Sequence, residues 1–272
     1  MRKPLADDHR ARGKSQFSGI PIPSRTDAIV ATQSPRRAPD QRWVVKGQLK
    51  QRMKWVLARP CIEICARFPT SRIVYLTRRA IGMQLDPPET ARIIAAIRSR
   101  GPCKLLVFGL GRDSPLWSRI NLGGMTVFLE DDPTWFQQVL RKHRKLNACL
   151  VDYASRREEW RELLDSPDRL ALALPESVER EGWDVILIDG PAGFADSNPG
   201  RMKAIAVARS LAAAPADVFV HDCDREVEQV YCDRFLGPEN LLHEVGVLRH
   251  YRVNRPTGRG GTSPERPASA PL

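Results

Sequence analysis

The sequence lacks the patterns that define several classes of protein. None of its six cysteines forms a CxxC pair, so neither a zinc ribbon nor an extracellular disulfide framework is indicated. It also lacks a recognisable secretory signal and any run of the roughly 18 to 20 apolar residues that a membrane helix needs. With 272 residues, 42% of them hydrophobic, the chain can bury one sizeable core. We therefore expect a soluble protein of a reducing, cytoplasmic compartment without an integral membrane segment.

The charge of the chain is unevenly distributed. Residues 1–100 carry a net charge of +14, residues 101–251 carry −6, and residues 252–272 carry +3. A basic arm ahead of an acidic globule could bind nucleic acid, an anionic membrane or an acidic polymer, because clustered Lys and Arg attract all three. No basic segment has the aromatic and glycine pattern of an RNA-binding module, so nucleic acid is the least favoured partner. A solvated extension without a partner is the simpler alternative.

Composition divides the chain into four parts. Residues 1–45 contain five prolines and little apolar periodicity, and we expect them to form a basic, disordered tail. Residues 46–81 are assigned to an accessory segment, with a helix and a short strand outside the main fold. Residues 82–251 carry the regular pattern of a folded domain. Residues 252–272 are rich in Pro, Gly and Ser and are expected to form a disordered C-terminal tail.

Short apolar runs alternate with helical stretches within the central part. The first helix is predicted over 87–100 and the first strand over 104–108. Further strands are predicted over 126–129, 148–151, 184–188 and 217–220, helices over 133–145 and 201–213, and an edge strand or hairpin over 244–253. Strands that alternate with helices imply right-handed crossovers and a mainly parallel sheet with helices on both faces. We therefore predict a Rossmann-like α/β domain.

The first strand is followed by a glycine pair. Ligands of such sheets bind beyond the carboxyl ends of the strands, where Gly109 and Gly111 would let the backbone turn tightly beside a ligand. Asp113 and Ser114 follow in the same loop. The third glycine of a dinucleotide fingerprint is absent, because Ser114 stands in its place. Taken alone, the motif is equally compatible with a structural turn.

The second strand ends in acidic residues. Glu130 lies 19 residues after Gly111, near the offset of about 20 at which an acidic side chain accepts the ribose hydroxyls of an adenosine ligand. Asp131 joins the same candidate site, and Asp131 or Asp132 could also cap the helix that begins near Pro133. The incomplete glycine fingerprint disfavours a pyrophosphate-bearing nicotinamide. It favours S-adenosylmethionine, whose sulfonium tail carries no phosphate.

Two later strands end in carboxylates and an imidazole. Asp189 follows the strand at 184–188, and His221 and Asp222 follow the strand at 217–220. A hydroxyl must lose its proton as it attacks a methyl group, so these side chains could serve as a general base. They could instead hold a divalent cation that makes the hydroxyl more acidic, or they could satisfy backbone groups at the strand ends.

The motifs, taken in order, resemble one known family. Five runs carry the resemblance: PCKLLVFGLGRDSPLW at 102–117, GGMTVFLEDDPTW at 123–135, WDVILIDGP at 183–191, PGRM at 199–202 and VFVHD at 218–222. Together they are similar to the plant glucuronoxylan 4-O-methyltransferase family and its xylan-biosynthesis relatives. The resemblance implies the Rossmann-like fold of S-adenosylmethionine-dependent methyltransferases. It also implies methyl transfer to a sugar hydroxyl, in plants the 4-hydroxyl of glucuronic acid on xylan.

The resemblance implies roles for the residues already singled out. The expected cofactor-binding residues are Gly109, Gly111, Asp113, Ser114, Glu130 and Asp131. The side chains of Asp189, His221 and Asp222 would face the acceptor hydroxyl, as a base or as metal ligands. The acceptor would be a carbohydrate that contains a uronic acid.

Three arginines are candidates for binding the acceptor. Arg201 and Arg225 could pair bidentately with a carboxylate, because the guanidinium group matches its geometry, or they could be structural ion-pair partners. Arg112 lies in the loop beside the expected cofactor. Plant members usually have His at the position of Arg112 and carry a membrane anchor that implies Golgi association. No such anchor is recognisable in this sequence.

Two other functions remain open from the sequence. The chain could be a small-molecule O-methyltransferase that uses the same cofactor site. It could also be a noncatalytic scaffold of polysaccharide biosynthesis that binds an acidic polymer through its basic N-terminal arm. The cluster formed by Asp189, His221 and Asp222 favours an enzyme, because a scaffold has no need of it.

Overall fold

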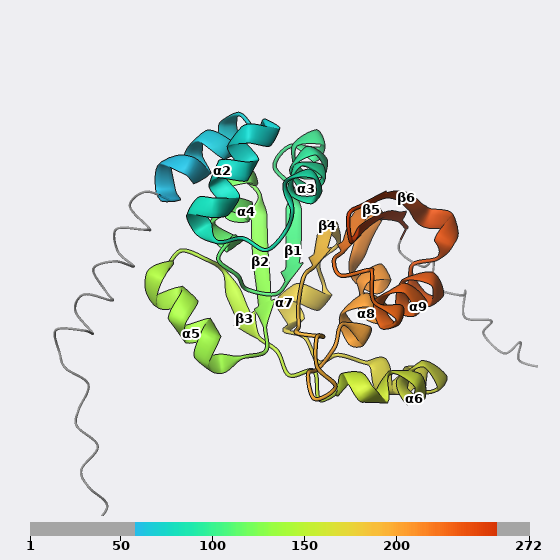
Figure 1. Ribbon diagram of the computed structural model, residues 1–272. Helices are drawn as coiled ribbons and strands as arrows, with labels where there is room; N and C mark the ends of the chain where they lie inside the picture. The colour runs from blue at the N-terminus through green and yellow to red at the C-terminus, as the bar shows by residue number, and fades with distance from the viewer. Residues whose placement is uncertain (1–57, 255–272) are drawn as a thin grey trace, which may run out of the picture. The chain divides into compact units, whose positions relative to one another are not determined.

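The computed structural model describes residues 58–254, which lie within one compact unit (Figure 1). The predictions of a basic N-terminal tail and of a C-terminal tail beyond residue 254 lie outside the described residues. No helix in the described range is long and apolar enough to cross a membrane.

A seven-stranded sheet forms the centre of this unit. Its strands are β1 (Lys104–Phe108), β2 (Met125–Glu130), β3 (Ala148–Leu150), β4 (Trp183–Ile188), β5 (Ala212–Val220), β6 (Leu241–Val245) and β7 (Leu248–Val253). They lie in the order β3-β2-β1-β4-β5-β7-β6, and only the pairings of β7 are antiparallel. The order reverses between β1 and β4, which is where open α/β sheets bind ligands. The predicted Rossmann-like α/β fold with a mainly parallel sheet is confirmed.

The helices connect the strands and cover both faces of the sheet. They are the segment 58–67, α2 (Ser71–Ile81), α3 (Pro87–Arg100), α4 (Ser114–Ile120), α5 (Pro133–Lys142), α6 (Trp160–Asp165), α7 (Glu176–Glu179), α8 (Met202–Leu211) and α9 (Glu226–Phe235). Short 3-10 helices occur at Arg157–Glu159, Pro167–Leu170 and Pro238–Asn240.

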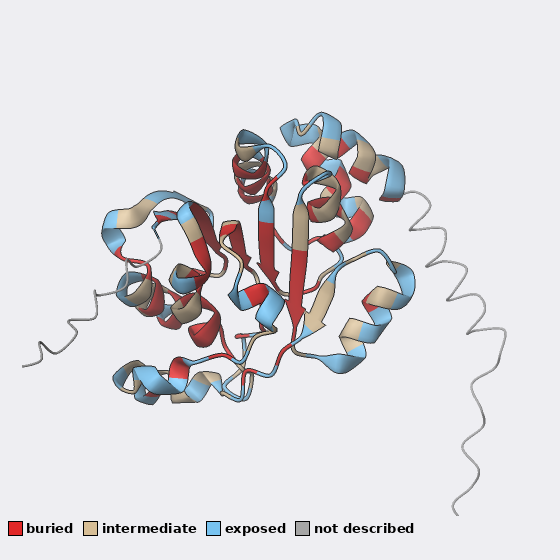
Figure 2. Ribbon diagram, turned by 180° about the vertical axis from the view of Figure 1, so that it is seen from behind, coloured by how far each residue is buried: buried red, intermediate tan, exposed pale blue. Residues whose placement is uncertain are grey.

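The sheet separates two hydrophobic cores. Because successive side chains of a strand point to opposite faces, Leu105 and Val107 of β1 belong to one core, and Leu106 and Phe108 belong to the other. The first core contains residues of α3 and α4, and the second contains residues of α8 and α9. Figure 2 shows the buried residues running along the central strands. Burial on both faces explains why these strands read as continuous apolar runs.

The described part of the accessory segment consists of two helices. Ile62 and Cys65 of the segment 58–67 belong to the same core as Leu105, and so does Val74 of α2. Thr70 caps α2, since its hydroxyl accepts a hydrogen bond from the backbone of Ile73 at 3.4 Å. Residues 58–81 contain no strand and pack on the sheet domain. The sequence placed the accessory segment outside the main fold, and for these residues that was wrong.

Strand β7 extends to Val253, two residues beyond the boundary expected from composition. Val253 is buried, and the Nη2 atom of Arg252 lies 2.8 Å from Oδ1 of the buried Asp217. Arg100 and His250 bind the same carboxylate, at 2.6 and 2.8 Å. Burial opposes the ionisation of Asp217, but these three hydrogen bonds hold its pKa well below the usual range. The paired charge therefore stabilises the end of the strand.

Candidate functional site

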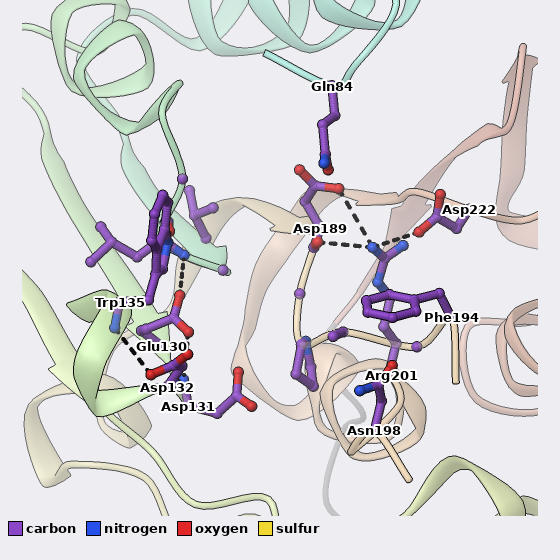
Figure 3. A pocket seen from close by; sticks show the side chains of 18 of the residues that line it. Gln84, Glu130, Asp131, Asp132, Trp135, Asp189, Phe194, Asn198, Arg201 and Asp222 are labelled. Atoms are coloured by element: carbon purple, nitrogen blue, oxygen red, sulfur yellow. Dashed lines mark hydrogen bonds and ion pairs between the residues drawn. The ribbon is translucent and has the colours of Figure 1, made fainter. Parts of the chain in front are cut away.

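A cavity of about 730 Å³ lies at the carboxyl ends of β1, β2 and β4 (Figure 3). Ten of the twelve predicted site residues line it: Gly109, Gly111, Arg112, Asp113, Glu130, Asp131, Asp189, Arg201, Asp222 and Arg225. The other two, Ser114 and His221, are buried and are not among its lining residues. The strand ends chosen from the sequence therefore meet at one site.

The turn after β1 has little room for side chains. Gly109 has φ of +113°, a conformation that residues with a side chain rarely adopt. A Cβ atom added to Gly190 would lie 2.9 Å from Cα of Gly109. A Cβ on Gly111 would lie 2.4 Å from Oδ1 of Asp113. Ser114 supports the turn, because its hydroxyl accepts a hydrogen bond from the Gly111 backbone at 2.9 Å. The turns after β1 and β4 can therefore touch, and the main chain forms this wall of the cavity.

The carboxylate of Glu130 is bound by backbone groups on both sides. Oε2 accepts a hydrogen bond from the N–H of Leu110 at 3.0 Å, and Oε1 accepts from the N–H groups of Asp131 and Asp132 at 3.1 and 2.9 Å. The indole of Trp135 donates to the carbonyl of Leu110 at 2.5 Å. A carboxylate offers about four acceptor positions, so Glu130 keeps one for a ligand. Burial raises the pKa of Glu130 above its ordinary value.

The two aspartates after Glu130 have different positions. Asp132 is the N-cap of α5, since its Oδ1 accepts hydrogen bonds from the N–H groups of Thr134 and Trp135 at 2.7 and 3.0 Å. The predicted cap at this helix is thus confirmed for Asp132. Both aspartates line the cavity, but Asp131 does not cap the helix, and burial raises its pKa. Asp131 therefore remains available to a ligand.

Asp113 adds negative charge to the cavity wall. It is buried, and its Oδ2 accepts a hydrogen bond from the indole of Trp117 at 2.9 Å. Burial and the nearby charge of Asp189 raise the pKa of Asp113 above its ordinary value. Two carboxyl groups that repel each other across a cavity favour a positively charged ligand between them.

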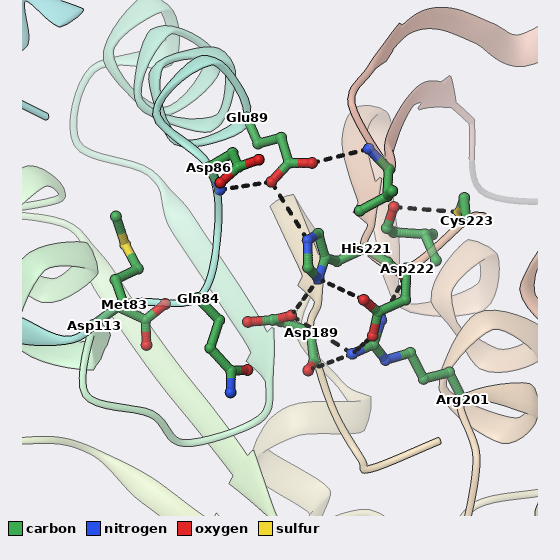
Figure 4. A network of polar contacts seen from close by, with 12 residues as sticks. Met83, Gln84, Asp86, Glu89, Asp113, Asp189, Arg201, His221, Asp222 and Cys223 are labelled. Atoms are coloured by element: carbon green, nitrogen blue, oxygen red, sulfur yellow. Dashed lines mark hydrogen bonds and ion pairs between the residues drawn. The ribbon is translucent and has the colours of Figure 1, made fainter. Parts of the chain in front are cut away.

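His221 is held by three carboxylates (Figure 4). Its Nδ1 lies 3.0 Å from Oδ1 of Asp189 and 3.3 Å from Oδ1 of Asp222, and its Nε2 lies 3.4 Å from Oε2 of Glu89. Burial alone would lower the pKa of His221, but hydrogen bonds with Asp189 and Glu89 and the charges of Asp189 and Asp222 raise it to about 10. At neutral pH the imidazole is therefore a cation and has no lone pair to accept a proton.

Glu89 was not among the predicted site residues. It is the N3 residue of α3, where its Oε2 accepts from the N–H of Asp86 at 2.7 Å and its Oε1 accepts from the N–H of Val247 at 2.9 Å. Burial alone would raise the pKa of Glu89, but these two hydrogen bonds and the hydrogen bond and charge of His221 lower it. The pattern DPPE at 86–89 is a sequence signal for the capping box. The pattern does not reveal that Glu89 also contacts His221 at the end of β5.

Arg201 joins the ends of β4 and β5. Its Nη2 lies 2.7 Å from Oδ2 of Asp222 and donates to the carbonyl of Asp189 at 2.8 Å, while its Nη1 donates to the carbonyl of His221. The side chain is only 5% exposed. Arg225 is engaged in a similar way, because its Nη2 lies 2.9 Å from the same oxygen of Asp222. Both guanidinium groups therefore act as the ion-pair partners that the sequence left as an alternative.

Arg112 differs from these two arginines. It is exposed and lines the cavity. It also lies next to Gly82, because a Cβ atom added to Gly82 would be 3.0 Å from Nη1 of Arg112. Within residues 58–254, Arg112 has no hydrogen bond or ion pair. Of the three predicted acceptor-binding arginines, Arg112 is the one whose charge is available to a ligand.

Asp189 presents one oxygen to the cavity. Its Oδ1 lies 3.0 Å from Nδ1 of His221 and 3.6 Å from Nη2 of Arg201, whereas Oδ2 has no polar partner in the described part of the chain. Figure 3 shows Asp189 between Glu130 and Asp222. A carboxylate held at one oxygen can accept a proton or a hydrogen bond at the other.

The same side chains do not fit a divalent cation. Asp222 already lies between Arg201 and Arg225, and both nitrogens of His221 face carboxylates. Over residues 58–254, no group of three or more His, Cys, Asp or Glu side chains could hold a metal ion. The cluster is therefore an ion-pair network.

Two solved structures align loosely with the chain. A methyltransferase-like protein from Silicibacter pomeroyi is 18% identical with a TM-score of 0.42, covering 63% of this chain and 88% of its own. A methyltransferase from Pyrococcus furiosus is 16% identical with a TM-score of 0.40, covering 67% and 98%. Similarity at this level carries no inference about the site.

Sequence relatives are more informative. Glucuronoxylan 4-O-methyltransferase 1 of Arabidopsis thaliana is 34% identical over 230 residues, which cover 75% of this chain and 80% of the relative. Arabinogalactan O-methyltransferase 2 of the same plant is 36% identical over 208 residues, covering 67% and 71%. The profile of the family described as IRX15/IRX15L/GXM matches residues 88–173 and 164–251. The predicted resemblance is thus confirmed, and the chain belongs to the IRX15/IRX15L/GXM family.

Proposed function

We propose that the protein is an S-adenosylmethionine-dependent O-methyltransferase that acts on a sugar hydroxyl, on a glycan that contains a uronic acid. The names of the relatives, glucuronoxylan 4-O-methyltransferase and arabinogalactan O-methyltransferase, support this substrate class. The observation that carries the proposal is the position of Asp189. Its unpaired Oδ2 stands in the cavity between the acidic end of β2 and the ion-pair network at the end of β5.

The part of the cavity at β1 and β2 fits S-adenosylmethionine. Glu130 retains one acceptor position and Asp131 lies beside it, so the pair can accept the two ribose hydroxyls. The turn at Gly109 lets the main chain approach the methionine portion, and Asp113 and Asp189 supply negative charge for the sulfonium. When bound, this cofactor supplies an electrophilic methyl group.

Asp189 is the residue best placed to act as general base. Its Oδ2 can accept the proton of an acceptor hydroxyl, while His221 holds Oδ1 and Glu89 holds the other side of the imidazole. His221 is thereby a positioning residue and not the base, because it is already protonated. A carboxylate is a weak base, so the alignment of donor and acceptor must supply most of the acceleration.

Calorimetric titration with S-adenosylhomocysteine tests the cofactor site. We expect micromolar binding that Asp131→Ala and Glu130→Ala each weaken about tenfold or more, or roughly 1.4 kcal/mol. Glu181→Ala is the matched control, because Glu181 pairs with Lys104 at the amino end of β1. A folded wild-type protein that does not bind would contradict the proposal and leave the noncatalytic scaffold as the better account.

Transfer of labelled methyl groups tests the chemistry. The acceptor is a xylo-oligosaccharide that carries glucuronic acid, and the variant is Asp189→Asn. We expect this variant to keep its affinity for S-adenosylhomocysteine and to lose roughly 100-fold or more in kcat, the scale of general-base catalysis. Equal rates for both proteins would rule out Asp189 as the base.

A further inference from the structure

Phe194 is an exposed aromatic residue at the wall of the cavity. Its side chain is 77% exposed, more than any other large hydrophobic side chain of residues 58–254. It also lines the cavity that contains Asp189. Exposed apolar side chains are common on protein surfaces, but one at the wall of a polar pocket is a candidate for ligand contact.

The loop between β4 and α8, which carries Phe194, is held in place by its own hydrogen bonds. The N–H of Gly200 donates to the carbonyl of Ala192 at 2.9 Å, which closes the base of the loop. The side chain of Asn198 accepts from the N–H of Ala195 at 2.9 Å, directly after Phe194. The exposed ring therefore stands on a defined backbone and can meet a ligand at little cost in conformational entropy.

The loop is also anchored to the segment before α6. The N–H of Arg157 donates to the carbonyl of Asn198 at 2.7 Å, and the hydroxyl of Ser155 donates to the carbonyl of Pro199 at 3.1 Å. The guanidinium of Arg157 pairs with Asp196. Contacts on both sides of Phe194 thus fix the loop to the rest of the unit.

The neighbouring glycine places Phe194 in one half of the cavity. A Cβ atom on Gly193 would lie 3.1 Å from Oε1 of Glu228 and 3.2 Å from Nη1 of Arg225, so this part of the loop packs against the start of α9. Figure 3 shows Phe194 on the side of Arg201, away from the acidic end of β2. The ring therefore faces the half of the cavity that the proposed cofactor leaves open.

We propose that Phe194 is the acceptor-stacking residue, whose ring packs against the apolar C–H face of a pyranose. A sugar ring has hydroxyls at its edge and C–H groups on its faces. An exposed aromatic ring beside polar groups matches this division, and stacking removes both apolar surfaces from water. This inference rests on the proposed function, because it assumes that the sugar acceptor binds in the part of the cavity beside Arg201.

The test compares Phe194→Ala and Phe194→Trp with the control Phe68→Ala. Phe68 is 57% exposed and does not line the cavity. The probe is a glucuronic-acid-bearing xylo-oligosaccharide, titrated calorimetrically in the presence of S-adenosylhomocysteine. We expect Phe194→Ala to weaken its binding about tenfold, or roughly 1.4 kcal/mol, and to raise KM by a similar factor. Phe194→Trp keeps a flat ring and should bind within about threefold of the wild type, and all variants should bind S-adenosylhomocysteine equally.

The outcomes separate this inference from the proposed function. A wild type that binds the oligosaccharide more tightly than Phe194→Ala, but transfers no methyl group, overturns the function and supports the stacking role. Equal binding by the wild type and Phe194→Ala overturns the stacking role even where methyl transfer proceeds. No binding of the oligosaccharide by the wild type also overturns it.

Discussion

The Nδ1 atom of His221 lies 3.0 Å from Oδ1 of Asp189, with Glu89 on the other side of the imidazole. These two contacts of His221 join the end of β5 to the end of β4 and to the first turn of α3. It fixes which oxygen of Asp189 faces the cavity. Protonation of His221 is therefore linked both to the stability of the protein and to the geometry of its site.

The first prediction concerns the stability of the protein in alkali. The folded-state pKa of His221 is raised from 6.5 to about 10. Its contribution is thus fully present below pH 6.5 and is lost as pH rises through about 10. We expect the free energy of unfolding by urea to fall by more than about 1 kcal/mol between pH 7 and 10 through this group. His221→Gln should remove that part of the decline, whereas the exposed His243→Gln should retain it.

The second prediction concerns Glu89. Glu89→Gln removes the charge beside the imidazolium and places an amide among groups that donate hydrogen bonds. We expect a loss of about 2 to 3 kcal/mol in the free energy of unfolding. The His221 pKa, followed by NMR titration, should fall. Glu176→Gln changes an exposed glutamate of α7 and should alter neither quantity. If the pKa of His221 were the same in Glu89→Gln as in the wild type, Glu89 would not be part of the network that raises it.

Much of the fold was predictable because its central strands are buried on both faces. The predicted strand at 104–108 matches β1, and the predicted helix at 87–100 matches α3, which begins with prolines and ends before a glycine. The predicted helix at 133–145 ends three residues early, at Lys142. Its last residues are basic and lack an apolar face that would hold them to the core.

The site was only partly predictable. Strand-end residues such as Glu130 and Asp189 could be found because a parallel sheet brings its carboxyl ends together. The pairing of His221 with Glu89 depends on how α3 packs over the sheet, and no local pattern encodes that contact. Phe194 lies in a loop without periodicity, where the sequence gives no sign of exposure at a cavity.

The third prediction concerns the buried carboxylate of Asp217. It lies 2.6 Å from Nε of Arg100 and 2.8 Å from Nη2 of Arg252. Asp217→Asn would leave these cations without their counter-charge, and we expect a loss of about 3 kcal/mol in the free energy of unfolding at pH 7. The native pKa is depressed, so the contribution is present above the ordinary value of 3.8 and is lost as pH falls through the lower folded value. The exposed Asp168→Asn is the control, and urea unfolding of both variants is the measurement.

The last prediction concerns Arg112, the cavity arginine without a partner among residues 58–254. We expect Arg112→Ala to raise KM about tenfold for an acceptor that carries glucuronic acid and to leave KM unchanged for the same oligosaccharide with a neutral sugar. Arg141→Ala, an exposed change in α5, should affect neither acceptor.

The affinity of the Arg112 variant for S-adenosylhomocysteine identifies which carboxylate the arginine binds. Unchanged affinity assigns the guanidinium to the acceptor, as predicted. A loss of affinity for S-adenosylhomocysteine but not for 5′-methylthioadenosine, which lacks the amino-acid carboxylate, would assign it to the cofactor instead and contradict the prediction. Arg201→Lys cannot answer the same question, because Arg201 pairs with Asp222 and is only 5% exposed, so its replacement would disturb the ends of β4 and β5 first.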